Sequence, residues 1–211
     1  MTEPAAPARA NRFARLRAAT DRVPTKWFAS IGTGLFLAVT AAFGGLAEAA
    51  EPPLATVAAG ETYTNDLYAI TVEKAFLFEE LSEAGAAEVE GMHVLALSVT
   101  LENMWTEPER TGRRTSTEEI FAVSVSGAEF ENSALLADGT LFPVMQPNVP
   151  ATVALTWYVP TGSIAPGDQV TVTLSDPTLW VGSFVSADKG WSSDEPSAEV
   201  TLTVSAGGSA S

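Results

Sequence analysis

The stretch GMHVLALSVTLEN, residues 91–103, decides the fold class of this 211-residue chain because its large apolar side chains recur at every second position. In an extended chain one face would carry His93, Leu95, Leu97, Val99 and Leu101, and the other would carry Val94, Ala96, Ser98 and Thr100. This alternation is typical of a strand that lies half-buried in a sheet. The stretch therefore predicts a β-strand.

Six further stretches show the same period or a short apolar run: 69–78, 120–127, 151–160, 169–175, 179–185 and 198–204. Turn sequences separate them, among them Asp138-Gly139, Pro166-Gly167-Asp168 and Asp188-Lys189-Gly190. From residue 61 onward, only 79–89 has the composition of a helical turn or two. The pattern predicts an all-β domain, an antiparallel β-sandwich of about seven strands.

Three of these stretches carry a family resemblance. The strand VLALSVTLEN, the later QPNVPATVALTWYVP and the closing AEVTLTV resemble the immunoglobulin-like (telokin-like) ectodomain family of uncharacterised Gram-positive membrane-anchored proteins and lipoproteins. That family pairs a strand ending in Asn with a later strand ending in Val-Pro, and Asn103 and Val159-Pro160 take those places here. The resemblance spans about residues 62–204. It implies an immunoglobulin-like sandwich outside the cytoplasm and no catalytic residues.

The segment 27–47 contains twenty-one residues without a charged side chain. At about 1.5 Å per residue, a helix of that length crosses a hydrocarbon core of about 30 Å. The segment therefore predicts one N-terminal transmembrane helix, or uncleaved signal anchor. The alternative is a cleaved signal peptide, because only nine of its residues are large and apolar and Ala47-Glu48-Ala49 has the form of a cleavage site.

The charge of the chain changes sign across this segment. Residues 1–26 carry six basic and two acidic side chains, whereas residues 51–211 carry five basic and twenty-three acidic ones. The positive-inside rule places the basic flank in the cytoplasm and the acidic part outside. The predicted organisation is a basic cytoplasmic tail (1–26), the apolar helix (27–47), a linker (48–61), the sandwich (62–204) and a flexible tail (205–211). We expect no nucleic-acid partner, because an acidic domain repels phosphate backbones.

Small side chains recur at every fourth residue of the apolar segment: Ser30, Gly34, Ala38 and Ala42. On a helix they would share one face, which would let a second helix approach closely in a bilayer. We therefore expect contact with the lipid bilayer and, through this face, with another membrane protein or a second copy of the chain. The alternative is a chance pattern in a segment rich in Ala and Gly.

Little in the sequence points to catalysis or to a cofactor. The chain has no cysteine and one histidine, His93, which excludes thiolate chemistry, disulfides, a lipidated cysteine and a cluster of histidine ligands. Five acids lack the Asp-x-Asp-x-Asp-Gly spacing of a calcium loop: Glu79, Glu80, Glu83, Glu88 and Glu90. The GxSxG, P-loop and GxGxxG patterns are absent from the domain. We expect no catalytic residue, no metal and no cofactor.

The connection 103–119, NMWTEPERTGRRTSTEE, is longer than an ordinary hairpin loop. It contains Trp105 and the basic cluster of the domain, Arg110, Arg113 and Arg114. Long loops on a rigid scaffold often bind partners, and Trp and Arg are common anchors of interfaces, so these four are the candidate interaction residues. The alternative is that Trp105 packs beneath the loop while the arginines pair with nearby acids, namely Glu107, Glu109, Glu118 and Glu119.

Together these features predict a single-pass protein of the cell membrane, with a cytoplasmic N-terminus and an extracytoplasmic domain. We expect the domain to recognise another protein and to be non-catalytic. One alternative is a secreted domain that binds a ligand or an ion after cleavage near Ala49. Another is an extracytoplasmic hydrolase that uses a pair of carboxylates.

Overall fold

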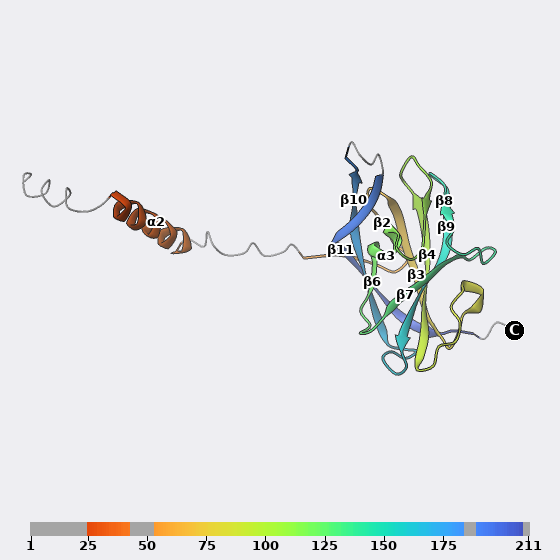
Figure 1. The fold of residues 1–211 in the computed structure, drawn as a ribbon. Coiled ribbons are helices and arrows are strands. Elements are labelled where there is room, and N and C mark those ends of the chain that lie inside the picture. The colour runs from red at the N-terminus through yellow and green to blue at the C-terminus, as the bar shows by residue number, and fades with distance from the viewer. Residues whose placement is uncertain (1–24, 43–52, 184–188, 209–211) are drawn as a thin grey trace, which may run out of the picture. The chain divides into compact units, whose positions relative to one another are not determined.

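The computed structural model describes residues 25–42, 53–183 and 189–208 (Figure 1). The chain divides between Pro52 and Pro53 into two compact units.

In the first unit, helix α2 covers Thr25–Ala42. No helix among the described residues is long and apolar enough to cross a membrane, so the transmembrane helix predicted over 27–47 is not supported. With 18 residues, α2 is about 27 Å long and is rich in Ala, Gly and Thr. Residues 43–47 of the predicted span lie outside the described residues.

The predicted small-residue face lies within α2. Ser30, Gly34 and Ala38 are exposed, and no heavy atom lies within 4 Å of the place where a Cβ of Gly34 would stand. The side chain of Ala42 is outside the described part of the chain. Contact of this face with another helix stays a prediction.

The second unit is a β domain, as the sequence predicted. Its elements are β1 (Ala55–Val57), β2 (Thr62–Thr64), β3 (Tyr68–Phe78), the 3-10 helix η1 (Ser82–Ala84), β4 (Met92–Asn103), β5 (Glu109–Arg110), helix α3 (Ser116–Ile120), β6 (Phe121–Val123), β7 (Glu129–Leu135), β8 (Val144–Met145), β9 (Pro150–Pro160), β10 (Gln169–Val181) and β11 (Lys189–Ala206).

Nine strands of the described chain form one continuous curled sheet, and its two halves, called the two sheets below, share β11 (Figure 1). One sheet has the order β6-β10-β11, and β1 pairs with β11 in parallel. The other has the order β11-β3-β4-β9-β7, and β2 pairs with β3. The strand β11 belongs to both sheets because its two parts have different neighbours. Residues 189–203 pair with β10, whereas residues 204–206 pair in parallel with residues 75–77 of β3. Strands β5 and β8 form a separate pair.

The main hydrophobic core of the described residues joins the two sheets. One sheet contributes Val172 and Val200 to it, and the other contributes Leu97 and Leu155. All four are 0–1 % exposed. In 91–103, the residues predicted to face inward, from Leu95 to Leu101, are buried in this core. The fold is therefore a β-sandwich whose sheets are joined along one side by β11.

The strand order bears on the predicted immunoglobulin-like topology. Strands β3 and β4 pair over ten residues of each within one sheet. Without the short β1, β2, β5 and β8, the first, second, fifth and fourth strands of the chain (β3-β4-β9-β7) lie side by side in one sheet, and the third, sixth and seventh (β6-β10-β11) lie in the other. This is the strand order of a constant-type immunoglobulin sandwich. The β-sandwich is confirmed, whereas membership of the immunoglobulin-like (telokin-like) family is not shown.

Several strand boundaries differ from the prediction. The stretches 169–175 and 179–181 form the single strand β10, and residues 182–183 lie outside it. The predicted linker 48–61 contains β1, and the predicted strand 120–127 is reduced to the three residues of β6. The stretch 79–89 contains η1, which is one turn as expected.

Candidate functional site

The connection that follows β4 is organised by Asn103, which is completely buried. Its amide Nδ2 donates hydrogen bonds to the carbonyl oxygens of Glu107 at 2.8 Å and Met145 at 3.0 Å. Its Oδ1 accepts a hydrogen bond from the backbone N–H of Trp105 at 2.9 Å. One side chain therefore satisfies three backbone groups and fixes the start of the connection.

Trp105 is half-buried and packs against the core rather than projecting from the loop. Its ring lies edge-on to that of Trp191 of β11, with 5.6 Å between the centroids and 89° between the planes. Lys189 of β11 lies 5.9 Å from the centre of the Trp105 ring and pairs with Glu107 at 2.6 Å. These contacts attach the connection to β11.

The middle of the connection is attached to the segment 142–145. Strand β5 pairs with β8, and the buried Thr111 donates its N–H to the carbonyl of Pro143 at 3.0 Å. The backbone of Phe142 is left-handed, with φ 51°, and a side chain at Gly112 would collide with its ring. Gly112, at φ 123°, is therefore required both by the backbone conformation and by the close approach of Phe142.

Helix α3 closes the connection. Thr115 caps it by accepting a hydrogen bond from the N–H of Thr117 at 3.3 Å, and its own hydroxyl donates to the carbonyl of Gly112 at 2.6 Å. Arg114, at φ 58°, donates its backbone N–H to the carboxylate of Glu118. A left-handed arginine is uncommon and is held here by the cap that follows it.

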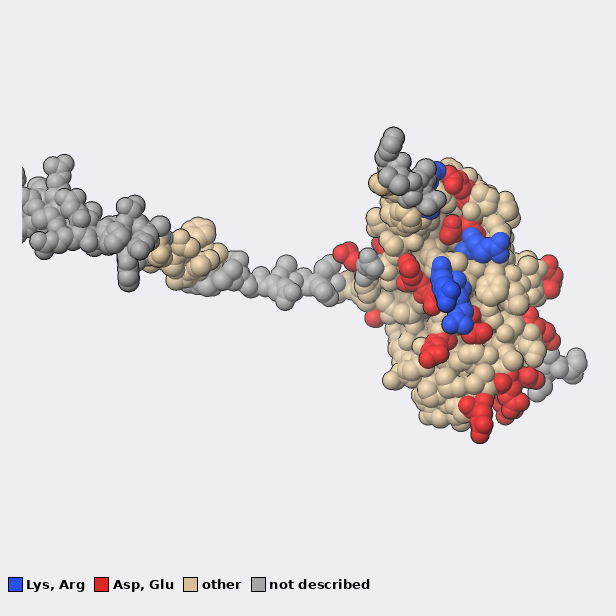
Figure 2. Space-filling view, in the orientation of Figure 1, with Lys and Arg blue, Asp and Glu red and all other residues tan. Residues whose placement is uncertain are grey.

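The braced connection presents Arg110, Arg113 and Arg114 to solvent, and we call these three exposed side chains the arginine surface. Arg110 donates to the carbonyl of Phe142 at 3.2 Å, and Arg113 pairs with Glu131 of β7 at 3.4 Å. Within the described residues, the Arg114 guanidinium forms no ion pair. Figure 2 shows basic side chains gathered near the middle of one face of the domain, with acidic side chains around them.

The alternative interpretation of the sequence paired the arginine side chains with four acids of the same connection. The structure shows other partners for these four acids. Glu107 binds Lys189, and Glu109 accepts a hydrogen bond from Ser116 at 3.1 Å. Glu118 binds the Arg114 backbone, and Glu119 accepts from the N–H of Ser193 in β11 at 3.1 Å. The acids therefore brace the connection. The position of Trp105 agrees with the alternative, and the exposed arginines remain a candidate interaction surface.

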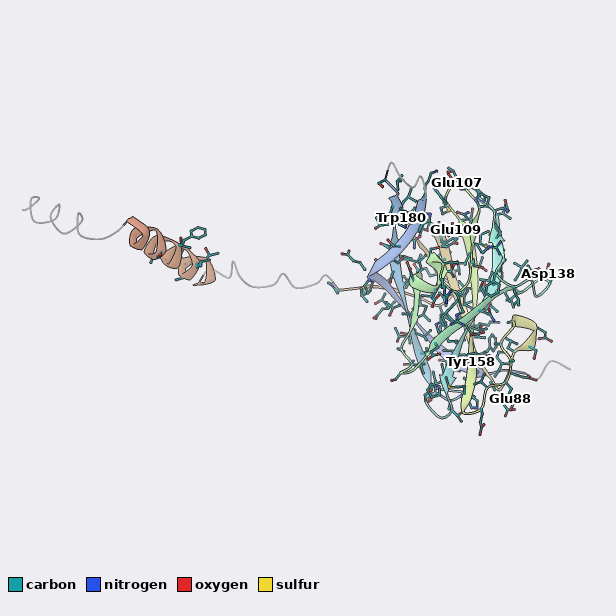
Figure 3. All side chains as sticks on the ribbon, in the orientation of Figure 1. Glu88, Glu107, Glu109, Asp138, Tyr158 and Trp180 are labelled. Carbon is teal, nitrogen blue, oxygen red and sulfur yellow. The ribbon has the colours of Figure 1, made fainter. Side chains whose placement is uncertain are left out.

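Glu109, labelled in Figure 3, belongs to a small polar cluster with Tyr68, Ser116 and Thr117. Partial burial raises the pKa of Glu109, and the hydrogen bond from Ser116 opposes that shift. The ring of Tyr68 is completely buried, and burial raises the pKa of its hydroxyl, with a further contribution from the Glu109 charge. The hydroxyls of Tyr68 and Thr117 are buried and make no hydrogen bond of normal geometry in the described residues, although the hydroxyls of Thr117 and Ser116 lie close enough to Tyr68 to oppose the rise of its pKa. Ser116 is only 4 % exposed, whereas Glu109 is half-exposed.

The far end of β10 and β11 forms a two-stranded ribbon that exposes apolar side chains (Figure 3 labels Trp180). Leu179, Trp180 and Val181 are 37 %, 46 % and 67 % exposed. The sequence predicted a strand here but did not identify this surface. The sequence feature that could have identified this surface is the run of three consecutive large apolar residues. Such a run places apolar side chains on both faces of a strand.

Two hollows are lined by residues of the segment that contains η1, including Leu81 and Glu83. One, of about 730 Å³, is lined in part by His93, Glu79, Glu80 and Glu83. The other, of about 480 Å³, is lined mainly by apolar residues, with Glu83 and Asp138 at its margin. His93 is half-buried, and its Nδ1 has no hydrogen-bond partner in the described part of the chain. Among the described residues no group of three or more His, Asp or Glu side chains is arranged to hold a metal ion.

Comparisons with known proteins add little to this description. No protein-family model matches the chain, and a search of curated proteins finds no match. Among solved structures, the chain is similar to an uncharacterised β-sandwich protein from Clostridium difficile 630, with 10 % sequence identity and a TM-score of 0.41 over 74 % of this chain and 97 % of the other. This similarity is too distant to inform function.

Proposed function

We propose that this chain is a non-catalytic module that recognises another protein outside the cytoplasm through the arginine surface. The observation that carries the proposal is that Arg110, Arg113 and Arg114 stand exposed on a connection braced along its length by Asn103, β8 and β11. A braced loop loses little conformational entropy when it binds, which favours affinity. Arginine forks bind carboxylates with two parallel hydrogen bonds, which favours specificity.

The surrounding charge supports a specific orientation of the partner. Residues 51–211 carry eighteen more acidic than basic side chains, and three of the five basic ones belong to the arginine surface. A carboxylate-bearing segment of a partner would be repelled by most of the domain and attracted at this one place. Electrostatic contrast of this kind steers encounter and suppresses wrong orientations.

The location outside the cytoplasm is supported by the basic flank 1–26 and the apolar segment 27–47, followed by an acidic domain. Export follows whether the apolar segment is retained or cleaved near Ala49. Cell fractionation with intact-mass analysis of the full chain tests this point. An intact chain in the cytoplasm would contradict the proposed location.

The arginine surface is tested by chemical cross-linking of the full chain in the membrane and extracellular fractions of its own cells. We expect the double variant Arg113→Glu, Arg114→Glu to lose a cross-linked partner protein by about tenfold or more, the scale of an interface anchor. The matched control is Lys74→Glu, which reverses an exposed charge on β3. Equal loss in the control, or full retention of the partner in the double variant, would refute the proposal.

A further inference from the structure

The outer edge of β10 is unpaired near its end. Strand β6 pairs with β10 only at residues 172–174. From Asp176 to Val181, β10 pairs with β11 on one side, and in the described part of the chain no strand pairs with it on the other. This edge therefore presents backbone N–H and C=O groups that another strand can bind.

The edge lacks the features that normally protect such strands. Natural edges carry charged side chains, prolines or bulges. Here the irregular register and Pro177 protect only the beginning, at Leu174 to Pro177. Residues 178–183 contain neither a charged residue nor proline, and Leu179, Trp180 and Val181 are among the exposed large apolar residues of the described chain.

The ribbon is braced, so its edge is held in an extended shape. The Trp180 indole lies against Gly190, where an added Cβ would come within 2.7 Å of its Nε1. Trp191 contacts Trp105, and Lys189 pairs with Glu107. A preformed edge loses little entropy when a second strand pairs with it.

We propose that this edge pairs antiparallel with the same edge of a second copy of the chain, so that two ribbons join into a four-stranded sheet about a two-fold axis. The argument for a second copy is that the contact line between the two edges, called the seam, carries no charge on either side. Two domains of the same strongly acidic charge repel each other over most of their surface, and an uncharged edge lets them approach at the smallest Coulomb cost. A two-fold axis also sets residues 178–181 of one chain opposite residues of the same uncharged, apolar stretch.

The pair is weak by itself. A stable interface buries about 800 Å² on each partner, more than one strand edge of six residues supplies. Pairing therefore needs a high local concentration or a covalent trap to be observed. The absence of cysteine from the chain makes disulfide trapping clean, because every disulfide comes from an introduced residue.

The experiment places one cysteine in the full chain at a time: Thr178→Cys, Leu179→Cys, Trp180→Cys and Val181→Cys. After mild oxidation we expect the yield of disulfide dimer to peak at one or two adjacent positions, where the two-fold axis passes, and to fall at the others, because Cβ atoms directly opposite lie about 4.5–5.5 Å apart. The control is Val149→Cys, at a residue that is 52 % exposed and outside the ribbon. A yield no higher than that of the control at all four positions overturns the proposal.

Two further measurements separate edge pairing from random collision. Adding Leu179→Lys or Val181→Lys beside the cysteine at the peak should reduce the dimer yield by about tenfold, because like charges then face each other across the seam. Raising the ionic strength to about 0.15 M should increase the yield, since salt screens the repulsion between the acidic bodies and leaves the uncharged seam intact. A yield that falls with salt, or that is unchanged by the added lysine, overturns the proposal.

Discussion

Removing the hydroxyl of Tyr68 should stabilise the domain. The ring lies in the hydrophobic core with 0 % exposure, and its hydroxyl makes no hydrogen bond of normal geometry among the described residues, although the hydroxyls of Thr117 and Ser116 are near it. Burying an unpaired hydroxyl costs about 1–3 kcal/mol, whereas phenylalanine fills nearly the same space without that cost. We therefore expect Tyr68→Phe to raise the free energy of unfolding by about 1 kcal/mol, and Tm by about 2–4 °C for a chain of this size.

Thermal unfolding of the full chain, followed by circular dichroism across a range of pH, measures this effect. The pKa of the buried Tyr68 hydroxyl is raised, so the unfolded chain releases that proton first as the pH rises. Stability that is present below the unfolded pKa of about 10 is then lost at higher pH, and the advantage of Tyr68→Phe should widen there.

The control for this prediction is Tyr63→Phe. The Tyr63 hydroxyl donates to Asp176 at 2.6 Å, and burial, followed by the hydrogen bond and charge of Asp176, raises its pKa to about 12. Loss of this bond should destabilise the domain by about 0.5–1.5 kcal/mol, the opposite sign. If Tyr68→Phe lowers Tm instead, its hydroxyl makes an interaction that stabilises the fold, and the reasoning from burial is wrong.

Three further changes test the bracing of the connection and of the segment around η1. We expect Asn103→Ala to lower the free energy of unfolding, measured in urea, by about 2–4 kcal/mol, because three backbone groups lose their partner at a buried position. A loss below about 1 kcal/mol would show that water replaces the amide. Glu109→Gln should stabilise the domain slightly at neutral pH, by less than about 1 kcal/mol for a half-exposed group. Because the pKa of Glu109 is raised in the fold, this gain should vanish as the pH falls below the ordinary carboxyl range, and a gain that persists in acid would contradict its assignment to the charge. Tyr158→Phe removes a hydrogen bond of 2.9 Å to the carbonyl of Ala87, so hydrogen exchange should quicken in residues 82–91 while it is unchanged in β10.

The long strands could be predicted from the sequence because large apolar residues recur at every second position. Strands β4 and β9 bury that face and also residues of the other face, such as Ala96 and Ala154. Strand β3 buries Ile70 and Val72 and, beyond the irregularity between Val72 and Lys74, Ala75 and Leu77. Strand β7 was missed because Asn132 and Ser133 interrupt the alternation. Both are buried and find partners far away in the sequence, Thr156 for Asn132 and Thr111 for Ser133. Local periodicity carries no information about such pairing.

The candidate site was predicted only in part for the same reason. The length and composition of 103–119 marked the arginines, but the partners that brace this connection come from elsewhere. Glu131 lies on β7, Met145 on β8, and Lys189 and Trp191 on β11. Which face of Trp105 or Trp180 would be covered depends on these distant elements, so it could not be inferred from either tryptophan's own neighbours in the sequence.

The parallel pairing of β1 with β11 has a mechanical consequence. Strand β1 opens the domain and β11 closes it, and they pair side by side through residues 55–57 and 198–200. Tension applied between the two ends of the domain pulls two parallel neighbours in opposite directions along their length. The hydrogen bonds between them are then loaded together in shear rather than opened one after another, so the first and last strands act as a clamp that must break before the sandwich can be stretched.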